Sequence, residues 1–126
     1  MKSYTDINQS KKLEEFLSPE SADMYYHYDF DFNELESIPT IKEEDDHFVL
    51  FPKDVRCWSL AALRSFLPCG VNINNTLHVF ESHKTFDNDW VYVYKFENSE
   101  PLYTKASNEI DACFEMISKL NELNLL

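Results

Sequence analysis

The sequence is poor in glycine and has no long apolar run. Its 126 residues include a single glycine, Gly70, which excludes the glycine-rich loops that cradle phosphates, such as the Walker A motif and GxGxxG. No apolar run approaches the roughly 18 residues of a membrane-spanning helix. The amino-terminal stretch also lacks the apolar segment of a secretory signal; it reads MKSYTDINQSKKLEEF. We therefore expect a cytoplasmic protein without a membrane span.

Basic residues are also scarce. The chain has 11 Lys and Arg against 23 Asp and Glu, a formal net charge of -12. Nucleic-acid binding requires a cationic surface that displaces counterions, and no cluster of Lys or Arg offers one. The same charge disfavours binding to anionic membranes. The composition therefore predicts no nucleic-acid and no membrane partner, and it fits either a basic protein as partner or no partner, with the acidity serving solubility alone.

The sequence contains neither a paired-cysteine motif nor a histidine metal motif. Its three cysteines are Cys57, Cys69 and Cys113, an odd number without a CxxC pair. This indicates free thiols in a reducing compartment. No two of the four histidines have the HxxxH spacing of a helical metal site; they are His27, His47, His78 and His83. We therefore expect no metal and no other cofactor.

What the chain does have is enough apolar material for one core. Hydrophobic residues make up 44% and aromatic residues 15%, which fits a single domain over residues 1–126. Helical spacing predicts helices from Thr5 or Asp6 to Leu17, over Cys57–Leu67 and from Ser107 to Leu126. Strands are expected at 24–32, 47–51, 76–81 and 90–96, with a short edge strand at 102–104. This irregular order predicts an α+β fold, with a small, mainly antiparallel sheet of four to five strands packed against two or three helices.

The apolar stripes of the second and third predicted helices indicate a shared core. Stripe residues at helical spacing face one side and are expected to be buried together. The predicted cluster consists of Trp58, Leu63, Phe66, Ile110, Phe114 and Ile117.

Residues 24–32 alternate aromatic and polar side chains and read MYYHYDFDF. Alternation at period 2 is typical of a half-buried strand. Burying two unpaired carboxylates costs more than burying two rings. We therefore expect Phe30 and Phe32 to point inward, and Asp29 and Asp31 to point outward.

Acidic residues are concentrated around this segment. Residues 20–46 hold ten acids and one base, Lys42. The stretch 33–46 contains Pro39 and few apolar residues, so a mobile acidic loop is predicted there. The candidate partner-binding residues combine an aromatic anchor with exposed carboxylates; they are Tyr25, Asp29, Asp31, Glu43, Glu44, Asp45 and Asp46.

Four strings of the sequence together resemble a known group of proteins. They read TDINQSKKLEEFL, ESADMYY, CWSLAAL and IDACFEMISKLNELNLL, and cover both ends and the middle helix, about half of the chain. The group consists of small uncharacterised proteins of gut bacteria and of their phages and mobile elements. The resemblance implies a bacterial or phage context and a cytosolic location. It implies no activity, so no catalytic residue is carried over.

Three functional hypotheses follow. The first is a small, non-enzymatic cytosolic accessory or protein-binding protein of unknown target. The second is an acidic inhibitor of a host defence or DNA-binding protein, because carboxylates about 7 Å apart along a strand match the spacing of phosphates. The third is a hydrolase that uses an Asp/His set or Cys57, since a thiol at a helix start has a lowered pKa. The first is favoured, and no catalytic residue is predicted.

Overall fold

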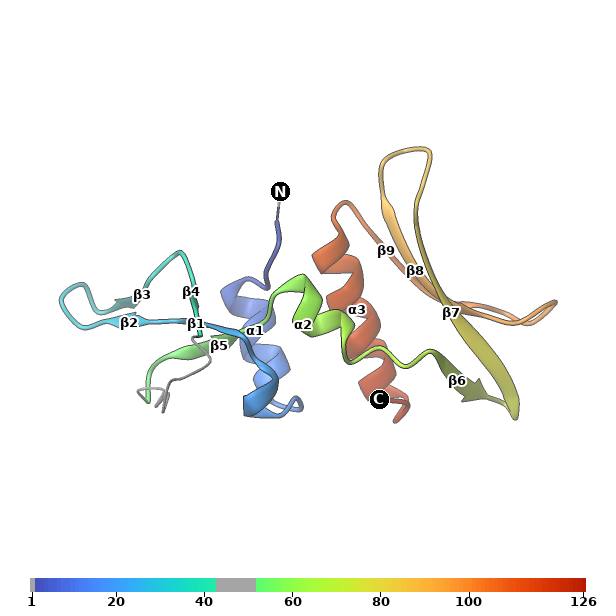
Figure 1. Cartoon of the computed structure of the whole chain (residues 1–126), viewed down its shortest axis with the longest axis horizontal. Coiled ribbons are helices and arrows are strands. Elements are labelled where there is room, and N and C mark those ends of the chain that lie inside the picture. Colours follow the sequence, from blue (N-terminus) through green and yellow to red (C-terminus); the bar gives the residue numbers. More distant parts are fainter. Residues whose placement is uncertain (1, 43–51) are drawn as a thin grey trace. The chain divides into compact units, whose positions relative to one another are not determined.

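The computed structural model of the chain describes residues 2–42 and 52–126. Within these ranges it contains three α-helices, one short 3-10 helix and nine strands that pair antiparallel. This confirms the α+β fold class, although the strands form three separate sheets instead of one. The chain divides into two compact units, Tyr4–Ala62 and Met1–Ser3 with Leu63–Leu126, which we call the amino-terminal unit and the carboxy-terminal unit (Figure 1). The single domain expected from chain length stays a prediction.

The first helix of the amino-terminal unit starts where the sequence indicated. Helix α1 (Ile7–Glu14) is preceded by Asp6, whose carboxylate accepts from the Gln9 backbone N–H at 2.8 Å. The Gln9 side chain accepts in turn from the Asp6 backbone N–H at 3.0 Å. This reciprocal capping satisfies two otherwise unpaired donors. The short helix η1 (Pro19–Ser21) follows, with Pro19 at its first position, where a proline is well tolerated.

Two small sheets complete this unit. One has the strand order β4-β1-β5 and the other is the hairpin β2-β3; their bounds are β1 (Met24–Tyr26), β2 (Tyr28–Asp29), β3 (Glu34–Leu35), β4 (Thr40–Ile41) and β5 (Val55–Cys57). Buried side chains of Tyr26, Val55 and Cys57 form one hydrophobic cluster of the unit's core. This cluster comes from β1 and β5, the two strands that pair with each other.

The continuous strand expected over residues 24–32 is wrong. Strand β2 ends at Asp29, and Phe30 and Phe32 are 61% and 74% exposed instead of buried. The Asp29 side chain accepts from the backbone N–H of Asp31 at 2.9 Å, and Asn33 adopts a positive φ of 53°. Both features are typical of turns. The turn chemistry of Asp and Asn therefore outweighs the alternation of the aromatic residues.

The loop predicted over residues 33–46 is partly regular. Strands β3 and β4 occupy two short stretches of it. The acidic residues 43–46 and the strand expected at 47–51 lie outside the described residues.

The helix predicted over Cys57–Leu67 begins later than expected. Cys57 is the last residue of β5, and α2 (Leu60–Arg64) starts three residues further on. The Ser59 hydroxyl accepts from the backbone N–H of Ala62 at 3.2 Å and donates to Asp23 at 2.5 Å. Ser59 therefore acts as an N-cap, while pairing with β1 keeps Cys57 extended.

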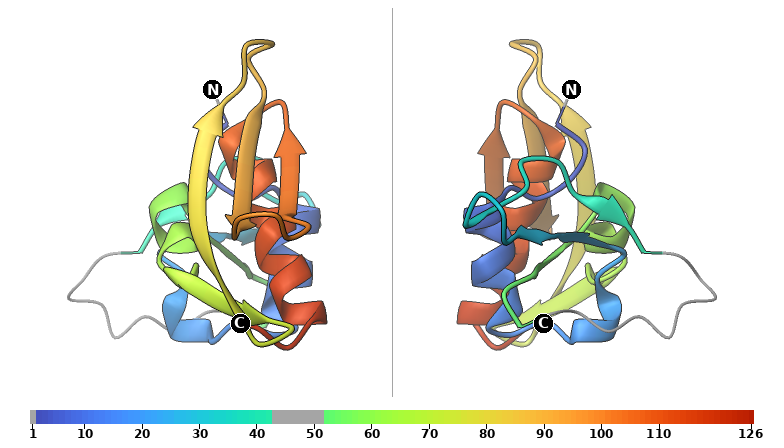
Figure 2. Two further views of the ribbon diagram at one scale, coloured as in Figure 1. Left: turned by 90° about the vertical axis from the view of Figure 1, so that its right-hand side faces the viewer. Right: turned by 90° about the vertical axis from the view of Figure 1, so that its left-hand side faces the viewer.

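The carboxy-terminal unit is a four-stranded antiparallel sheet with one helix on it. The order is β6-β7-β8-β9, with β6 (Gly70–Ile73), β7 (Thr76–Lys84), β8 (Trp90–Lys95), β9 (Leu102–Ala106) and α3 (Glu109–Glu122). Helix α3 packs on β8 and β9, and the left view of Figure 2 shows the sheet in front of it.

Strand β6 was not predicted. Asn108, not Ser107, caps α3, because its side chain accepts from the Asp111 backbone N–H at 2.9 Å.

The predicted core residues are only partly buried. Four of them are fully buried: Trp58, Leu63, Ile110 and Ile117. Phe66 and Phe114 are half-buried, which corrects their assignment to the core. Helix α2 ends at Arg64, so Phe66 does not lie on its apolar stripe. No helix within the described ranges is long and apolar enough to cross a membrane.

Candidate partner-binding hairpin

The hairpin β2-β3 is held at its base by a buried carboxylate. The Asp54 side chain is 2% exposed, and its Oδ1 accepts from the Tyr28 backbone N–H at 2.8 Å. The same oxygen lies 3.2 Å from Nδ1 of His27. The Glu36 backbone N–H donates to the carbonyl oxygen of His27 at 2.8 Å. Asp54 thereby accepts a hydrogen bond from the backbone at the point where the chain passes from β1 into the hairpin. This bond anchors the hairpin to the rest of the amino-terminal unit.

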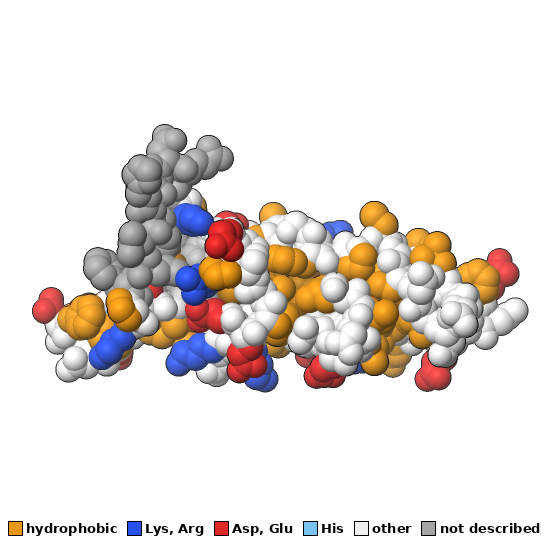
Figure 3. Space-filling model, turned by 90° about the horizontal axis from the view of Figure 1, so that it is seen from below, with side chains coloured by type: hydrophobic (Ala, Val, Ile, Leu, Met, Phe, Trp, Pro, Cys, Tyr) orange, Lys and Arg blue, Asp and Glu red, His pale blue; other side chains and the backbone are white. Residues whose placement is uncertain are grey.

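Aromatic rings of this hairpin face solvent. Tyr28 and Phe30 pack edge to face, with ring centroids 5.0 Å apart. The Lys53 ammonium lies 4.6 Å from the Tyr28 centroid and 5.8 Å from that of Phe30, distances at which a ring attracts a cation. Figure 3 shows surface hydrophobic side chains beside charged ones at its left end, where Figure 1 places the hairpin. Rings exposed in this way can receive an apolar group or a cation from a partner.

Carboxylates face each other across the two strands. Asp29 and Glu34 are directly opposite in the hairpin register, an arrangement in which like charges destabilise a strand pair. Within the described ranges neither residue forms an ion pair with a Lys, Arg or His. Beside them lies an open hollow of about 410 Å³, lined by Asp29, Glu34, Leu35, Glu36, Ser37 and Ile38. A cationic side chain placed at this hollow would relieve the repulsion.

The structure brings together only some of the predicted partner-binding residues. Asp29 and Asp31 share the turn of the hairpin, whereas Tyr25 lies half-buried in β1, in a different sheet. The four predicted carboxylates at 43–46 fall outside the described residues. Sequence reasoning missed Phe30 and Phe32 as surface groups. The signal that could have found them is the spacing of turn formers in Asp-Phe-Asp-Phe-Asn, which predicts a turn at the exposed end of a hairpin.

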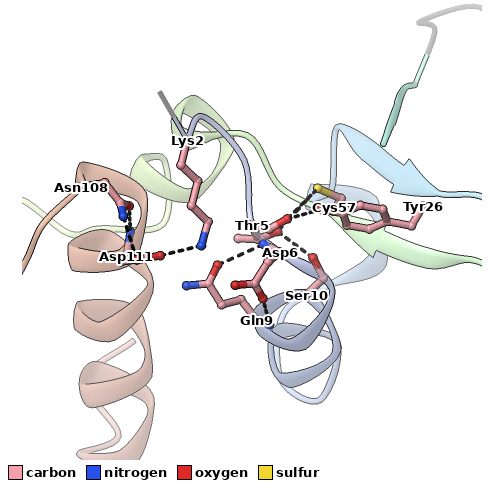
Figure 4. A network of polar contacts seen from close by, with 9 residues as sticks. All are labelled: Lys2, Thr5, Asp6, Gln9, Ser10, Tyr26, Cys57, Asn108 and Asp111. Atoms are coloured by element: carbon pink, nitrogen blue, oxygen red, sulfur yellow. Dashed lines mark hydrogen bonds and ion pairs between the residues drawn. The ribbon is translucent and has the colours of Figure 1, made fainter. Parts of the chain in front are cut away.

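The Cys57 thiol is a packed group. It is fully buried, it lies 3.6 Å from the Thr5 hydroxyl, and it donates to the Thr5 carbonyl oxygen at 3.4 Å. Figure 4 shows Thr5 at the centre of this network, where its carbonyl also accepts from the Tyr26 hydroxyl at 2.7 Å and its hydroxyl lies 2.7 Å from that of Ser10. Burial raises the pKa of the Cys57 thiol. The thiol is therefore held in its protonated form, the opposite of what a nucleophile needs.

The Asp54–His27 pair is the described Asp/His set that most resembles a hydrolytic arrangement. A carboxylate at Nδ1 orients an imidazole in hydrolytic triads, with the nucleophile at the other ring nitrogen. In this protein the same carboxylate oxygen also accepts from a backbone N–H of the hairpin. The contacts of Asp54 with the Tyr28 backbone N–H and with His27 therefore fit a role in anchoring the hairpin. The described part of the chain contains no group of three or more His, Cys, Asp or Glu placed to hold a metal ion.

Comparisons of this chain with protein-family models, with curated proteins and with solved structures found no match. Function is therefore inferred from the geometry and chemistry of the hairpin.

Proposed function

We propose that this protein is a non-enzymatic, cytoplasmic protein-binding protein that docks on a basic partner protein through the hairpin β2-β3. One observation carries the proposal: the exposed rings of Phe30 and Phe32 stand next to the facing carboxylates of Asp29 and Glu34. Aromatic residues supply much of the binding energy of interfaces, and surrounding charges select the partner.

Charge supports a basic partner over a neutral one. The amino-terminal unit carries 14 acidic and 5 basic residues, a net charge of -9. A field of this sign accelerates the approach of a basic surface. At contact, a Lys or Arg of the partner offsets the Asp29–Glu34 repulsion. The contacts of Lys53 with Tyr28 and Phe30 indicate that these rings accept a cation.

The two alternative hypotheses have less support. Mimicry of nucleic acid required carboxylates spaced along an extended strand, and the turn that follows Asp29 removes that spacing. Hydrolysis by Cys57 required an activated thiol at a helix start. Cys57 instead ends β5, and burial raises its pKa. The protein-binding hypothesis uses the exposed features of the hairpin directly.

The test compares hairpin variants with matched controls. A protein retained from bacterial lysate by the immobilised wild type is identified, purified and titrated against each variant at low and high salt. Phe30→Ser with Phe32→Ser is expected to weaken binding about 100-fold, since each exposed anchor contributes on the order of 1.4 kcal/mol. The control is Phe86→Ser, which removes a fully exposed ring from the turn between β7 and β8, and it is expected to bind like the wild type.

Charge variants test the second half of the proposal. Asp29→Asn with Glu34→Gln is expected to slow association and to reduce its salt dependence. The control pair is Glu97→Gln with Glu100→Gln, which removes two exposed carboxylates from the carboxy-terminal unit. The proposal is wrong if wild type and hairpin variants retain the same proteins, or bind the purified partner equally well.

A further inference from the structure

We propose that two copies of this chain associate through strand β9, which joins their two sheets into one. The inference concerns the carboxy-terminal unit and is independent of the hairpin function. Strand β9 is the last strand in the order β6-β7-β8-β9, so one of its sides has no strand partner within the described chain. An edge strand of this kind presents main-chain donors and acceptors to another strand.

The hydrogen-bond alternation identifies which groups of β9 are free to pair. The backbone N–H of Thr85 donates to the carbonyl oxygen of Asp89 at 2.7 Å, at the end of the β7-β8 ladder. This bond sets the alternation along β8. The β8-β9 register then directs the N–H and C=O groups of Tyr103 and Lys105 toward the open edge. The Lys119 ammonium reaches the Tyr103 carbonyl oxygen at 2.9 Å, which agrees with a carbonyl that points away from β8.

The open edge is complementary to itself. If two β9 strands pair antiparallel about a two-fold axis at Thr104, Tyr103 lies opposite Lys105 of the second copy, and Lys105 lies opposite its Tyr103. Each pair exchanges two main-chain hydrogen bonds. The Tyr103 ring is 53% exposed and lies on the same face of the sheet as Lys105. The Lys119 ammonium already lies 6.0 Å from the Tyr103 ring centroid, so the ring accepts cations.

This register is favoured over the neighbouring one whose axis lies at Tyr103. Shifting the axis to Tyr103 would place Pro101 opposite Lys105 of the second copy, and proline has no N–H to donate. A groove of about 510 Å³ runs beside the strand, lined by β9 and the α3 residues Glu115 and Lys119. It leaves room for the second strand once Lys119 moves away. Because Lys119 competes for the same carbonyl oxygen, we expect the association to be weak.

A second copy fits this edge better than an unrelated strand. The occupant must present a lysine opposite Tyr103 and, two residues away, an aromatic residue opposite Lys105, and β9 itself meets both requirements. Two-fold pairing of β9 with β9 also closes after two chains, whereas pairing β9 with the other edge, β6, would give a larger ring or an open filament. The carboxy-terminal unit has a net charge of only -3, so repulsion between copies of this unit is modest.

Sedimentation equilibrium of the full chain, from roughly 1 µM to 1 mM, tests the proposal. We expect the mass to rise from the 14.9 kDa of one chain to twice that value. Tyr103→Pro removes an outward N–H and leaves the bonds to β8 in place, as prolines at sheet edges do. It is expected to weaken association at least tenfold.

The matched control is Asn72→Pro, on the opposite edge. The Phe80 backbone N–H donates to the carbonyl oxygen of Cys69, and the same alternation directs the main-chain groups of Asn72 outward. This variant is expected to associate like the wild type. Near-ultraviolet circular dichroism verifies that both variants fold.

A measurement without any substitution covers the case in which Tyr103→Pro does not fold. In hydrogen exchange of the wild type, the amides of Tyr103 and Lys105 are expected to become more protected as concentration rises, while that of Asn72 stays unchanged. The proposal is overturned by a single-chain mass over the whole range, by an unchanged dimer in folded Tyr103→Pro, or by unchanged protection at β9.

Discussion

Alkaline pH should destabilise this protein through its buried thiols and phenols. Burial raises the pKa of the fully buried Cys113 thiol from 9.0 to about 12. Burial also raises the pKa values of Cys57 and of the three buried tyrosines Tyr26, Tyr92 and Tyr94. A group with a raised pKa keeps its proton in the folded state and releases it on unfolding. Stability is therefore complete below pH 9 and is lost as the pH rises above that value.

The magnitude follows from linkage. Between pH 8 and pH 11 the Cys113 thiol alone should reduce the free energy of unfolding by about 2.5 kcal/mol, because each pH unit contributes about 1.36 kcal/mol per proton released. Cys57 acts in the same direction, and the tyrosines add to the loss above pH 10. All five buried groups therefore lower the free energy of unfolding as the pH rises above 9.

Urea denaturation at pH 8, 9, 10 and 11, followed by tryptophan fluorescence, measures this dependence. Cys113→Ala is expected to reduce the slope of stability against pH by about one proton. Cys69→Ala is the matched control, since Cys69 is exposed, and it should leave the slope unchanged. A stability that stays constant from pH 8 to pH 11, or an equal slope in both variants, would refute the reasoning.

Three further substitutions test the packing and polar contacts by thermal denaturation. Asp54→Ala should cost about 1–3 kcal/mol, because it leaves the part-buried backbone N–H of Tyr28 without its acceptor at the base of the hairpin, whereas Asp54→Asn keeps the acceptor and should cost less. Asp6→Ala should cost about 1 kcal/mol through loss of the cap of α1; no change would show that the cap is not stabilising. Ile117→Ala, at a fully buried position, should cost about 2–5 kcal/mol, while Phe86→Ala, at an exposed one, should leave the melting temperature unchanged.

The elements that could be predicted from the sequence depend on near neighbours. The start of α1 depends on Asp6 and Gln9, which are three residues apart. Strand β8 and helix α3 each follow a regular apolar pattern within one segment. In all of these the residues that make the contacts are close in the chain, so local chemistry is sufficient.

The candidate site was predicted only in part. Asp31 is exposed as expected and Asp29 is half-buried, but Phe30 and Phe32 were assigned to the core and are exposed. Alternation at period 2 does not distinguish a strand with a buried face from a hairpin end whose rings face solvent. The turn after Asp29 and the contact with Asp54 favour the hairpin end. Asp54 lies 26 residues from Tyr28, whose backbone N–H donates to it.

By itself the sequence determined the fold class, the acidic charge, the approximate positions of the three α-helices and those of strands β7, β8 and β9, because these depend on composition and on short-range periodicity. Only the tertiary structure decided that Cys57 ends a strand, since β1 supplies its partner from more than thirty residues away. It also decided which residues of β9 stay open, since that depends on the alternation across β7 and β8. The environment of a side chain depends on which distant segments pair with each other. The periodicity within one segment does not reveal that pairing.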